Sequence, residues 1–331
     1  MTSIIEDLQD PAALPDETAS VAVVQTHISM VFVGDEFVYK VKKPVDFGFL
    51  DFSTLDKRAH FCRQEVALNR RLAEDIYLDV LPVTFDGKRH RLTGGGGEVV
   101  DYAVRMRRIP DTVLMKSLFE RGELTPEHLE KVADRLSRFH STAATGPDIA
   151  AFGEPDRFKV NTDENFQQIR KYIGVSIQKA QYDALREWTR GFFRDHASLF
   201  HQRIEKGKIR DCHGDLHMEH VCFTENLSII DCIEFNERFR YSDTLADVAF
   251  LLMDLEYHGG KDAADRLWAF YSEASGDRDD ALLTFYKVYR AVVRGKVNSF
   301  QVDDTAISED EKQSAVRTAA RYFDLACSYI A

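Results

Sequence analysis

Strand-like segments are confined to the first third of this 331-residue chain, and the rest is mainly helical. Residues 21–42 are rich in Val, Phe and Tyr, and the segments VAVV, SMVFV and EFVYKV are typical of strands separated by turns. Apolar side chains recur at helical spacing in residues 53–74, and two more strand-like segments follow at 80–85 and 99–106. This order predicts an α+β fold, in which the sheet and most of the helices occupy separate parts of the molecule.

The remainder of the chain follows a join at Arg107–Asp111. Helical periodicity and capping residues predict a series of helices there, near residues 125–140, 163–172, 177–203, 243–256, 260–273, 279–298 and 309–329. A short apolar, β-like stretch at 210–241 interrupts them, and residues 1–20 read as a polar lead-in. We therefore expect two domains: a small β-rich lobe with one helix at 1–109, and a larger, mainly helical lobe at 110–331.

The charge balance argues against nucleic acid as a partner. The chain has 43 basic and 55 acidic residues, a net charge of -12, whereas contacts with phosphate backbones need clustered Lys and Arg. No stretch approaches the roughly 18 consecutive apolar residues of a membrane span, and no signal peptide is recognisable at the start. We expect a cytoplasmic protein whose partners are small molecules rather than nucleic acids or membranes. The sequence does not indicate an oligomeric state.

The stretch 211–231, DCHGDLHMEHVCFTENLSIID, has a pattern suited to phosphoryl transfer. That reaction needs one group that orients or deprotonates the attacking hydroxyl, and others that hold a metal ion against the phosphates. Asp215 lies in a polar loop and suits the first role. Val221–Phe223 and Leu227–Ile230 are expected to form a hairpin that returns Asp231 to this loop, where its carboxylate suits a metal ion.

HGDLHMEHV followed by IIDCIEF resembles the HGDLHxxN…hhD signature (h apolar) of the aminoglycoside phosphotransferase and choline-kinase-like superfamily. The resemblance implies a two-lobed, protein-kinase-like fold that uses ATP and Mg2+. It also implies that Asp215 is the catalytic base or orienting residue and that Asp231 is the principal metal ligand. His220 stands where the family usually has a metal-binding Asn, and because imidazole nitrogen suits Mn2+ better than Mg2+, we expect Mn2+ to be tolerated or preferred.

The first part of the chain extends the resemblance. Lys40, in VYKV, resembles the strand lysine that contacts the nucleotide phosphates, and Glu65 resembles the helix glutamate that pairs with it. Lys42 lies on the same strand face, and we favour Lys40 because Lys42 is nearer the strand end. Only one of the two is expected to reach Glu65 and the phosphates. Met106 begins the segment expected to form the hinge against which adenine stacks.

A protein-kinase glycine-rich loop is absent, and QTHIS stands in its place. The hydroxyls of Thr26 and Ser29, with backbone amides, are the groups left to cover phosphates there. The resemblance extends over residues 20–300. The segment SMVFVGDEFVYKVKKPVDFGFLDFSTLDKR is similar to an uncharacterised bacterial branch of the superfamily, some members of which carry a fused P-loop domain. No G-x-x-x-x-G-K-[ST] motif occurs in this chain.

The predicted function is an ATP-dependent kinase that phosphorylates a hydroxyl group of a small molecule. One alternative is a metal-dependent hydrolase, because His213, Asp215, His217 and His220 form an H-x-D-x-H-x-x-H cluster whose side chains suit zinc or iron. Another is a nucleotide-binding pseudokinase with little catalysis. The sequence does not identify the acceptor, because one fold supports many substrates.

Residues downstream of the cluster have mostly structural interpretations. Asp243 is expected to cap a helix and Asp247 to anchor the catalytic loop. Arg290, Arg294 and Lys296 form a basic cluster on an acidic protein, and the two arginines share a helix face at i, i+4 spacing. They fit either an anionic substrate group or ion pairs with nearby acids, and the sequence does not decide between the two.

Overall fold

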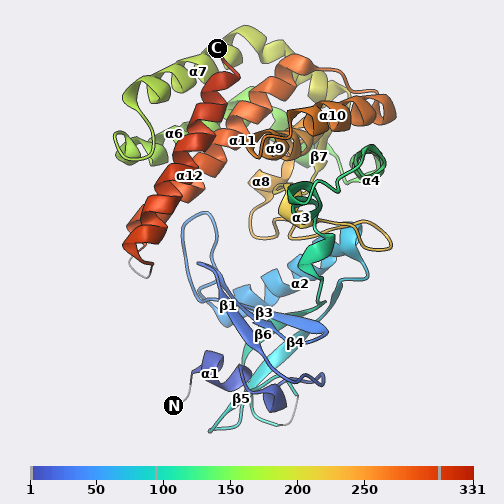
Figure 1. Ribbon diagram of the computed structural model, residues 1–331. Helices are drawn as coiled ribbons and strands as arrows, with labels where there is room; N and C mark the ends of the chain where they lie inside the picture. The colour runs from blue at the N-terminus through green and yellow to red at the C-terminus, as the bar shows by residue number, and fades with distance from the viewer. Residues whose placement is uncertain (1–2, 94–95, 305–306) are drawn as a thin grey trace. The chain divides into compact units, whose positions relative to one another are not determined.

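A computed structural model of the chain describes residues 3–93, 96–304 and 307–331. The chain divides into two compact units: unit 1 comprises Met1–Glu123 and Glu219–Glu237, and unit 2 comprises Leu124–Met218 and Arg238–Ala331. Unit 1 holds the main sheet and unit 2 is mainly helical, as the ribbon in Figure 1 shows.

The elements follow the predicted order. The strands are β1 Ala22–Gln25, β2 Ser29–Val33, β3 Phe37–Lys42, β4 Tyr77–Phe85, β5 His90–Arg91, β6 Glu98–Arg107, β7 Ile209–Asp211, β8 Val221–Cys222, β9 Ser228–Ile229 and β10 Tyr241–Asp243. The α-helices are α1 Ile4–Leu8, α2 Leu55–Ala73, α3 Met115–Glu120, α4 Pro126–Thr142, α5 Pro147–Ala150, α6 Pro155–Ile169, α7 Lys179–Glu205, α8 Glu237–Arg240, α9 Thr244–Tyr257, α10 Lys261–Ser275, α11 Asp280–Phe300 and α12 Glu309–Ser328.

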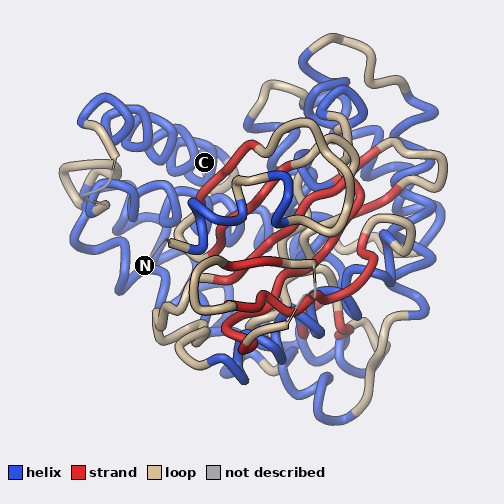
Figure 2. The backbone as a smooth tube through the Cα atoms, turned by 90° about the horizontal axis from the view of Figure 1, so that it is seen from below, coloured by secondary structure: helices blue, strands red, loops and turns tan. Residues whose placement is uncertain are grey.

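Unit 1 is built on an antiparallel sheet with the strand order β1-β2-β3-β6-β4-β5. The strands lie side by side in the view of Figure 2. β3 is central, and its Lys40 is paired with Val31 of β2 and Val104 of β6. Because side chains alternate along a strand, Lys40 and Lys42 project from one face of the sheet, and Tyr39 projects from the other.

The two faces of this sheet are covered by different parts of unit 1. α2 packs against β4 and β6 (Figure 1), and its apolar residues form a cluster with Val104. The opposite face packs against the N-terminal residues, of which Leu8, Ala13 and Leu14 are buried beside Tyr39. The interpretation of residues 1–20 as a polar lead-in is therefore wrong. Its few apolar residues are spaced over one short helix and a turn, too briefly for a periodic signal.

The predicted hairpin around residues 221–230 is present. β8 and β9 pair antiparallel, with Val221 opposite Ile229 and Cys222 opposite Ser228. The hairpin is held in unit 1 by β9, which lies against α2, and by a bridge between Leu114 and Cys222. This attachment explains why the two units differ from the boundary predicted between residues 109 and 110. The remainder of segment 219–237 and the residues up to Glu123 belong to unit 1.

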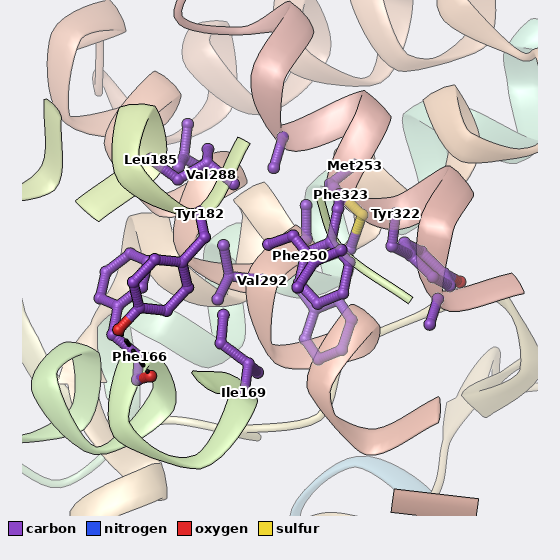
Figure 3. Packing of buried hydrophobic residues seen from close by; sticks show 14 residues of the cluster. Phe166, Ile169, Tyr182, Leu185, Phe250, Met253, Val288, Val292, Tyr322 and Phe323 are labelled. Carbon is purple, nitrogen blue, oxygen red and sulfur yellow. Dashed lines mark hydrogen bonds between the residues drawn. The ribbon is translucent and has the colours of Figure 1, made fainter. Parts of the chain in front are cut away.

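Unit 2 has its core between α6, α7, α9, α11 and α12. Figure 3 shows the packing of this core, in which Phe166, Phe250, Val292 and Phe323 are buried. α11 and α12 approach closely at Gly295, where an added Cβ would lie 2.6 Å from the Phe323 ring. Among the described residues, no helix has the length and apolar character needed to cross a membrane. The α+β fold class is confirmed: a curled antiparallel sheet precedes a mainly helical part.

Candidate active site

Lys40 lies at the centre of a cluster of charges in unit 1. Its Nζ is 2.9 Å from Oε1 of Glu65 on α2 and 2.8 Å from Oδ1 of Asp231, which follows β9. Burial opposes the positive charge, but Asp231 and Glu65 outweigh it and raise the pKa of Lys40 well above its ordinary value. The three predicted residues are thus brought together from segments up to 191 residues apart.

Lys42 occupies the same face but is more deeply buried. Its Nζ is 2.6 Å from Oε2 of Glu65, contacts Oε1 of Glu234, and lies 4.7 Å from the Phe52 ring centre. The expectation that only one of the two lysines reaches Glu65 is therefore wrong. The two carboxylate oxygens of Glu65 each take one lysine, because side chains two positions apart on a strand lie side by side.

The two glutamates of this cluster respond differently to burial. Burial opposes ionisation of Glu65, but the charges of Lys40 and Lys42 outweigh it and lower its pKa. For Glu234, burial is the larger influence and raises the pKa despite Lys42. Glu234 was missed in the sequence because a lone acidic residue after a strand carries no motif. Its proximity to Asp231, within IIDCIEF, was the only available signal.

Asp231 is held in an unusual backbone conformation. Its φ is 61°, in the left-handed region that non-glycine residues seldom adopt. The backbone N–H donates to the Tyr77 hydroxyl at 3.1 Å, and the next residue, Cys232, donates to Asn69 Oδ1 on α2 at 2.8 Å. Strained residues of this kind persist where their surroundings impose them, often at functional sites. The side chain remains 45% exposed, so its carboxylate is open to a ligand.

His220, expected to be a second metal ligand, lies beside Asp231. Its Nε2 is 3.6 Å from Oδ2 of Asp231, and its carbonyl accepts a hydrogen bond from Ile230 at 2.9 Å. Two ligands of one octahedral ion at about 2.1 Å are about 3 Å apart, so a small side-chain adjustment would let both bind it. One carboxylate oxygen and one imidazole nitrogen therefore fit a divalent ion, whereas the other carboxylate oxygen faces Lys40.

The remaining predicted nucleotide contacts are also in unit 1. Met106 lies on β6, half-buried in the apolar cluster that includes Ile109 and Ile230. The Thr26 hydroxyl accepts the backbone N–H of Ser29 at 2.9 Å and closes the turn between β1 and β2. Ser29 is fully buried. This arrangement does not expose the Ser29 hydroxyl for a phosphate, and the backbone N–H groups of Thr26, Ile28 and Ser29 are already bonded within the turn.

Asp215 follows a tightly held loop in unit 2. Asp247, near the start of α9, accepts hydrogen bonds from the backbone N–H groups of His213 at 2.7 Å and Gly214 at 2.9 Å. The predicted anchoring role of Asp247 is confirmed. Arg290 of α11 donates to the Gly214 carbonyl at 2.9 Å. Both the N–H and the carbonyl group of Gly214, the residue before Asp215, are thus hydrogen-bonded to side chains. The Asp215 side chain is 35% exposed.

The histidines around Asp215 have separable roles. His213 is fully buried, and its Nδ1 accepts the Asp215 backbone N–H at 3.3 Å. Nε2 of His217 lies 3.7 Å from Oδ2 of Asp215. His140, at the end of α4, places Nε2 3.3 Å from Asp247 and Nδ1 2.8 Å from the Tyr271 hydroxyl.

This network keeps Asp247 ionised. Burial opposes its charge, but the hydrogen bond from His140 and nearby positive charges outweigh burial and lower the pKa of Asp247 to about 2. The predicted cap at the start of α9 is confirmed as well, because the Asp243 side chain accepts the N–H of Leu245 at 3.0 Å.

The basic cluster on α11 divides among different partners. Arg290 binds the Gly214 and Ala246 carbonyls, and Lys296 donates to Asn165 Oδ1 at 2.7 Å. Among the described residues, neither therefore uses a carboxylate as its hydrogen-bond acceptor, and the alternative of ion pairs with nearby acids does not describe these two side chains. The role of Arg290 at the loop was not foreseen, because a carbonyl acceptor leaves no mark in the sequence.

Comparison with known proteins identifies relatives over most of the chain. Residues 34–283 match the model of the phosphotransferase enzyme family. Uncharacterized proteins of Mycobacterium tuberculosis and Mycobacterium bovis are each 32% identical over 310 residues, which is 93% of this chain and 59% of each relative. The chain thus spans about three fifths of the length of these curated relatives.

Two solved structures have the same fold. A choline/ethanolamine kinase family protein from Mesorhizobium loti aligns with a TM-score of 0.53 and 14% identity, covering 97% of this chain and 98% of its own. The GDP and kanamycin complex of APH(2″)-IIIa aligns with a TM-score of 0.54 and 15% identity, covering 96% of both chains. At these identities the likeness concerns the fold alone, and it confirms the kinase-like fold class.

Proposed function

Because the chain belongs to the phosphotransferase enzyme family, we propose that it transfers the γ-phosphoryl group of ATP to a hydroxyl group of a small molecule in the cytoplasm. The observation that carries this proposal is the pairing of Lys40 with both Glu65 and Asp231 in unit 1. A lysine held between a helix glutamate and a metal-binding aspartate is the arrangement that nucleotide phosphates and their metal ion require.

In the proposed reaction, unit 1 binds the nucleotide. Lys40 contacts the phosphates, and Glu65 orients its ammonium group. Asp231 and His220 would hold a divalent ion, which would supply positive charge against the phosphates. Met106 contacts the adenine. The left-handed backbone of Asp231 and its half-exposed carboxylate support this assignment, because strained residues of this kind are often found at functional sites.

Asp215 acts on the acceptor. It accepts the proton of the acceptor hydroxyl, while the hydroxyl oxygen forms a bond to the γ-phosphorus and the bond between that phosphorus and the β,γ-bridging oxygen breaks. ADP leaves with the bridging oxygen. The grip of Asp247 and Arg290 on Gly214 supports this role, because proton transfer requires a carboxylate fixed in position.

The hydrolase alternative receives less support. Its predicted cluster includes His213, which is fully buried and one of whose ring nitrogens accepts the Asp215 N–H. It also leaves the cluster of Lys40, Lys42 and Glu65 without a role. The pseudokinase alternative is decided by turnover alone.

Substitutions at Asp231 and Asp215 test two parts of the proposal separately: Mg-ATP binding and phosphoryl transfer. Asp231→Asn should weaken Mg-ATP binding strongly, because the metal loses a charged ligand. Asp215→Asn should leave Mg-ATP affinity within about threefold but lower turnover by about a hundred- to ten-thousand-fold. Asp183→Asn, which changes an exposed carboxylate paired with Lys179, is the matched control.

Calorimetric titration of Mg-ATP and a screen of metabolite extracts for phosphorylated products provide the two measurements. Full turnover in a folded Asp215→Asn protein would rule out its role as base. Failure of the wild type to bind Mg-ATP would overturn the proposed function itself.

A further inference from the structure

Arg294 is set rigidly on the face of α11 that also carries Arg290. The neighbouring Gly295 lets α11 approach α12, because any Cβ there would lie 2.6 Å from the Phe323 ring. This close approach places the Arg294 guanidinium 5.6 Å from the ring centre of Tyr322, which is labelled in Figure 3. A guanidinium held against an aromatic face is preorganised for a ligand.

Tyr322 itself belongs to a stack of two tyrosine rings, each of which contacts an arginine. Its ring lies 3.7 Å from that of Tyr257 with an interplanar angle of 9°, and Arg321 lies 4.5 Å from the centre of the Tyr257 ring. Arg321 donates to the Tyr257 carbonyl at 3.3 Å. The stack therefore holds two arginines by the same kind of contact, but only Arg321 uses its guanidinium to bond a carbonyl.

Arg294 is a positive charge that pairs with no carboxylate in the described part of the chain. Among residues 3–93, 96–304 and 307–331, its side chain makes no ion pair within 4.0 Å and its Nε is buried without a hydrogen-bond partner, so that Tyr322 is the side chain that stabilises it most directly. Buried donors are nearly always satisfied in folded proteins. A cation left in this state points to a ligand that supplies the missing acceptor.

The position of Arg294 relates it to the acceptor. Arg290, one helical turn earlier, bonds the carbonyl of the residue before Asp215. Burial opposes the charge of Arg294, but Tyr322 and the negative charge of Asp215 outweigh it and raise its pKa. Asp215 is therefore close enough to act on Arg294 electrostatically, yet it makes no ion pair with it.

We propose that Arg294 binds an anionic group of the acceptor, so that the acceptor is a hydroxyl compound carrying a carboxylate or a phosphate. The proposal rests on the proposed function, because it places the ligand at Asp215. Arginine forks match both oxyanions in geometry and charge. An ammonium-bearing acceptor, by contrast, would be repelled by Arg294.

Matched acceptors that differ only in charge test the proposal. Gluconate, glucitol and 1-amino-1-deoxyglucitol share a polyol chain, and glucose 6-phosphate, glucose and glucosamine form a second series. Each compound is assayed for phosphorylation by ATP and, by ligand-observed NMR, for binding to the Mg-ADP form. We expect the anionic members to bind and react best. Arg294→Met should then weaken their binding or raise their KM by about 10- to 100-fold and leave the neutral members unchanged.

Arg294→Lys and Arg321→Met complete the experiment. The lysine variant keeps the charge without the fork and should lie between wild type and Arg294→Met. Arg321→Met removes the arginine that contacts the other ring of the same stack and should leave the charge preference intact. The inference is wrong if no anionic member binds, if Arg294→Met binds them as well as wild type, or if it lowers kcat equally for neutral acceptors. That last result would assign Arg294 to the transferred phosphoryl group. Mg-ATP binding is measured for every variant as well. If it is retained while the acceptor results contradict the inference, only the inference about Arg294 is wrong and the proposed function stands.

Discussion

Lys40 and Lys42 occupy one face of β3 but face different surroundings. The Lys40 side chain is 16% exposed and adjoins the half-exposed Asp231, whereas Lys42 is 1% exposed and lies between two buried glutamates. Exposure to ligand therefore supports Lys40 as the phosphate contact. The burial of Lys42 supports a structural role, because an ammonium enclosed by two carboxylates has no face left for a nucleotide.

Parallel substitution by Met should separate these roles. Lys40→Met should lower kcat/KM for ATP by about 10- to 100-fold. It should cost little stability, because Glu65 still pairs with Lys42 and the Asp231 carboxylate remains exposed to water. Lys42→Met should destabilise the fold by about 3–5 kcal/mol, because it leaves Glu234 buried without its cation. Chemical denaturation and ATP kinetics on both variants make the comparison.

Glu234→Gln provides the control for that experiment. Combined with Lys42→Met, it removes the uncompensated charge, so the double variant should be more stable than Lys42→Met alone by about 1–3 kcal/mol. Additive losses would mean that the pair is not coupled. If instead Lys42→Met lowers kcat/KM for ATP and Lys40→Met lowers stability, Lys42 is the phosphate contact.

His220 should determine which metal ion the site prefers. Imidazole nitrogen suits Mn2+ better than Mg2+, and Nε2 already lies 3.6 Å from Asp231. We expect Mn2+ to support activity at least as well as Mg2+, and His220→Asn to shift the preference toward Mg2+ while activity persists. Metal titrations at fixed ATP measure this. Identical profiles for the two proteins would show that His220 is not a ligand.

The residues that could be found in the sequence share a property. Asp215, Asp231, Lys40 and Glu65 belong to short local patterns whose order along the chain is itself informative. Glu234 has no such pattern, because its partner Lys42 is 192 residues away. The burial of Ser29 was equally hidden, since a serine at a turn looks the same whether its side chain faces solvent or the core.

At the scale of elements, the loop that precedes Asp215 depends on two helices. α9 supplies Asp247 to the loop's N–H groups, and α11 supplies Arg290 to its carbonyl. The elements themselves were largely predictable from periodicity: α4, for example, begins at Pro126 as its capping residues indicate. α6 begins at Pro155, well before the predicted 163, because its first turns contain Asp, Asn and Thr, which are weak helix formers that tertiary packing overrides.

Asp247 predicts how stability changes in acid. Its pKa is lowered to about 2 in the folded protein, so between about pH 4 and pH 2 the unfolded chain binds more protons than the folded one. The stabilisation, about 2 kcal/mol at neutral pH, is therefore present above pH 4 and lost as the pH falls. The free energy of unfolding of Asp247→Asn should lie below that of wild type at pH 7, and the difference should narrow toward pH 2. Denaturation at several pH values measures both, and a difference independent of pH would contradict the assignment.

At the scale of the whole molecule, each unit has its own core. The clusters beside the sheet belong to unit 1, and the cluster around Phe250 and Phe323 belongs to unit 2. The predicted order of sheet and helices survives in this division. The assignment of 219–237 to unit 1 could not be predicted, because a segment flanked by helical sequence gives no indication of which core it joins.

Separate cores predict that nucleotide binding stabilises the units unequally. Residues proposed to bind Mg-ATP lie on β3, on α2 and after β9, all in unit 1. A ligand at a concentration of a hundred times its Kd stabilises the form that binds it by about 2.7 kcal/mol. Local unfolding confined to the core of unit 2 does not release the ligand, so its free energy is not changed by binding. Hydrogen–deuterium exchange should therefore show Mg-ATP slowing exchange in β3, α2 and residues 228–234 by up to about 100-fold, with little change in the centres of α6 and α12. Asp231→Asn should remove the protection, since it removes binding. Equal slowing in both units would mean that they open only together, as one cooperative structure.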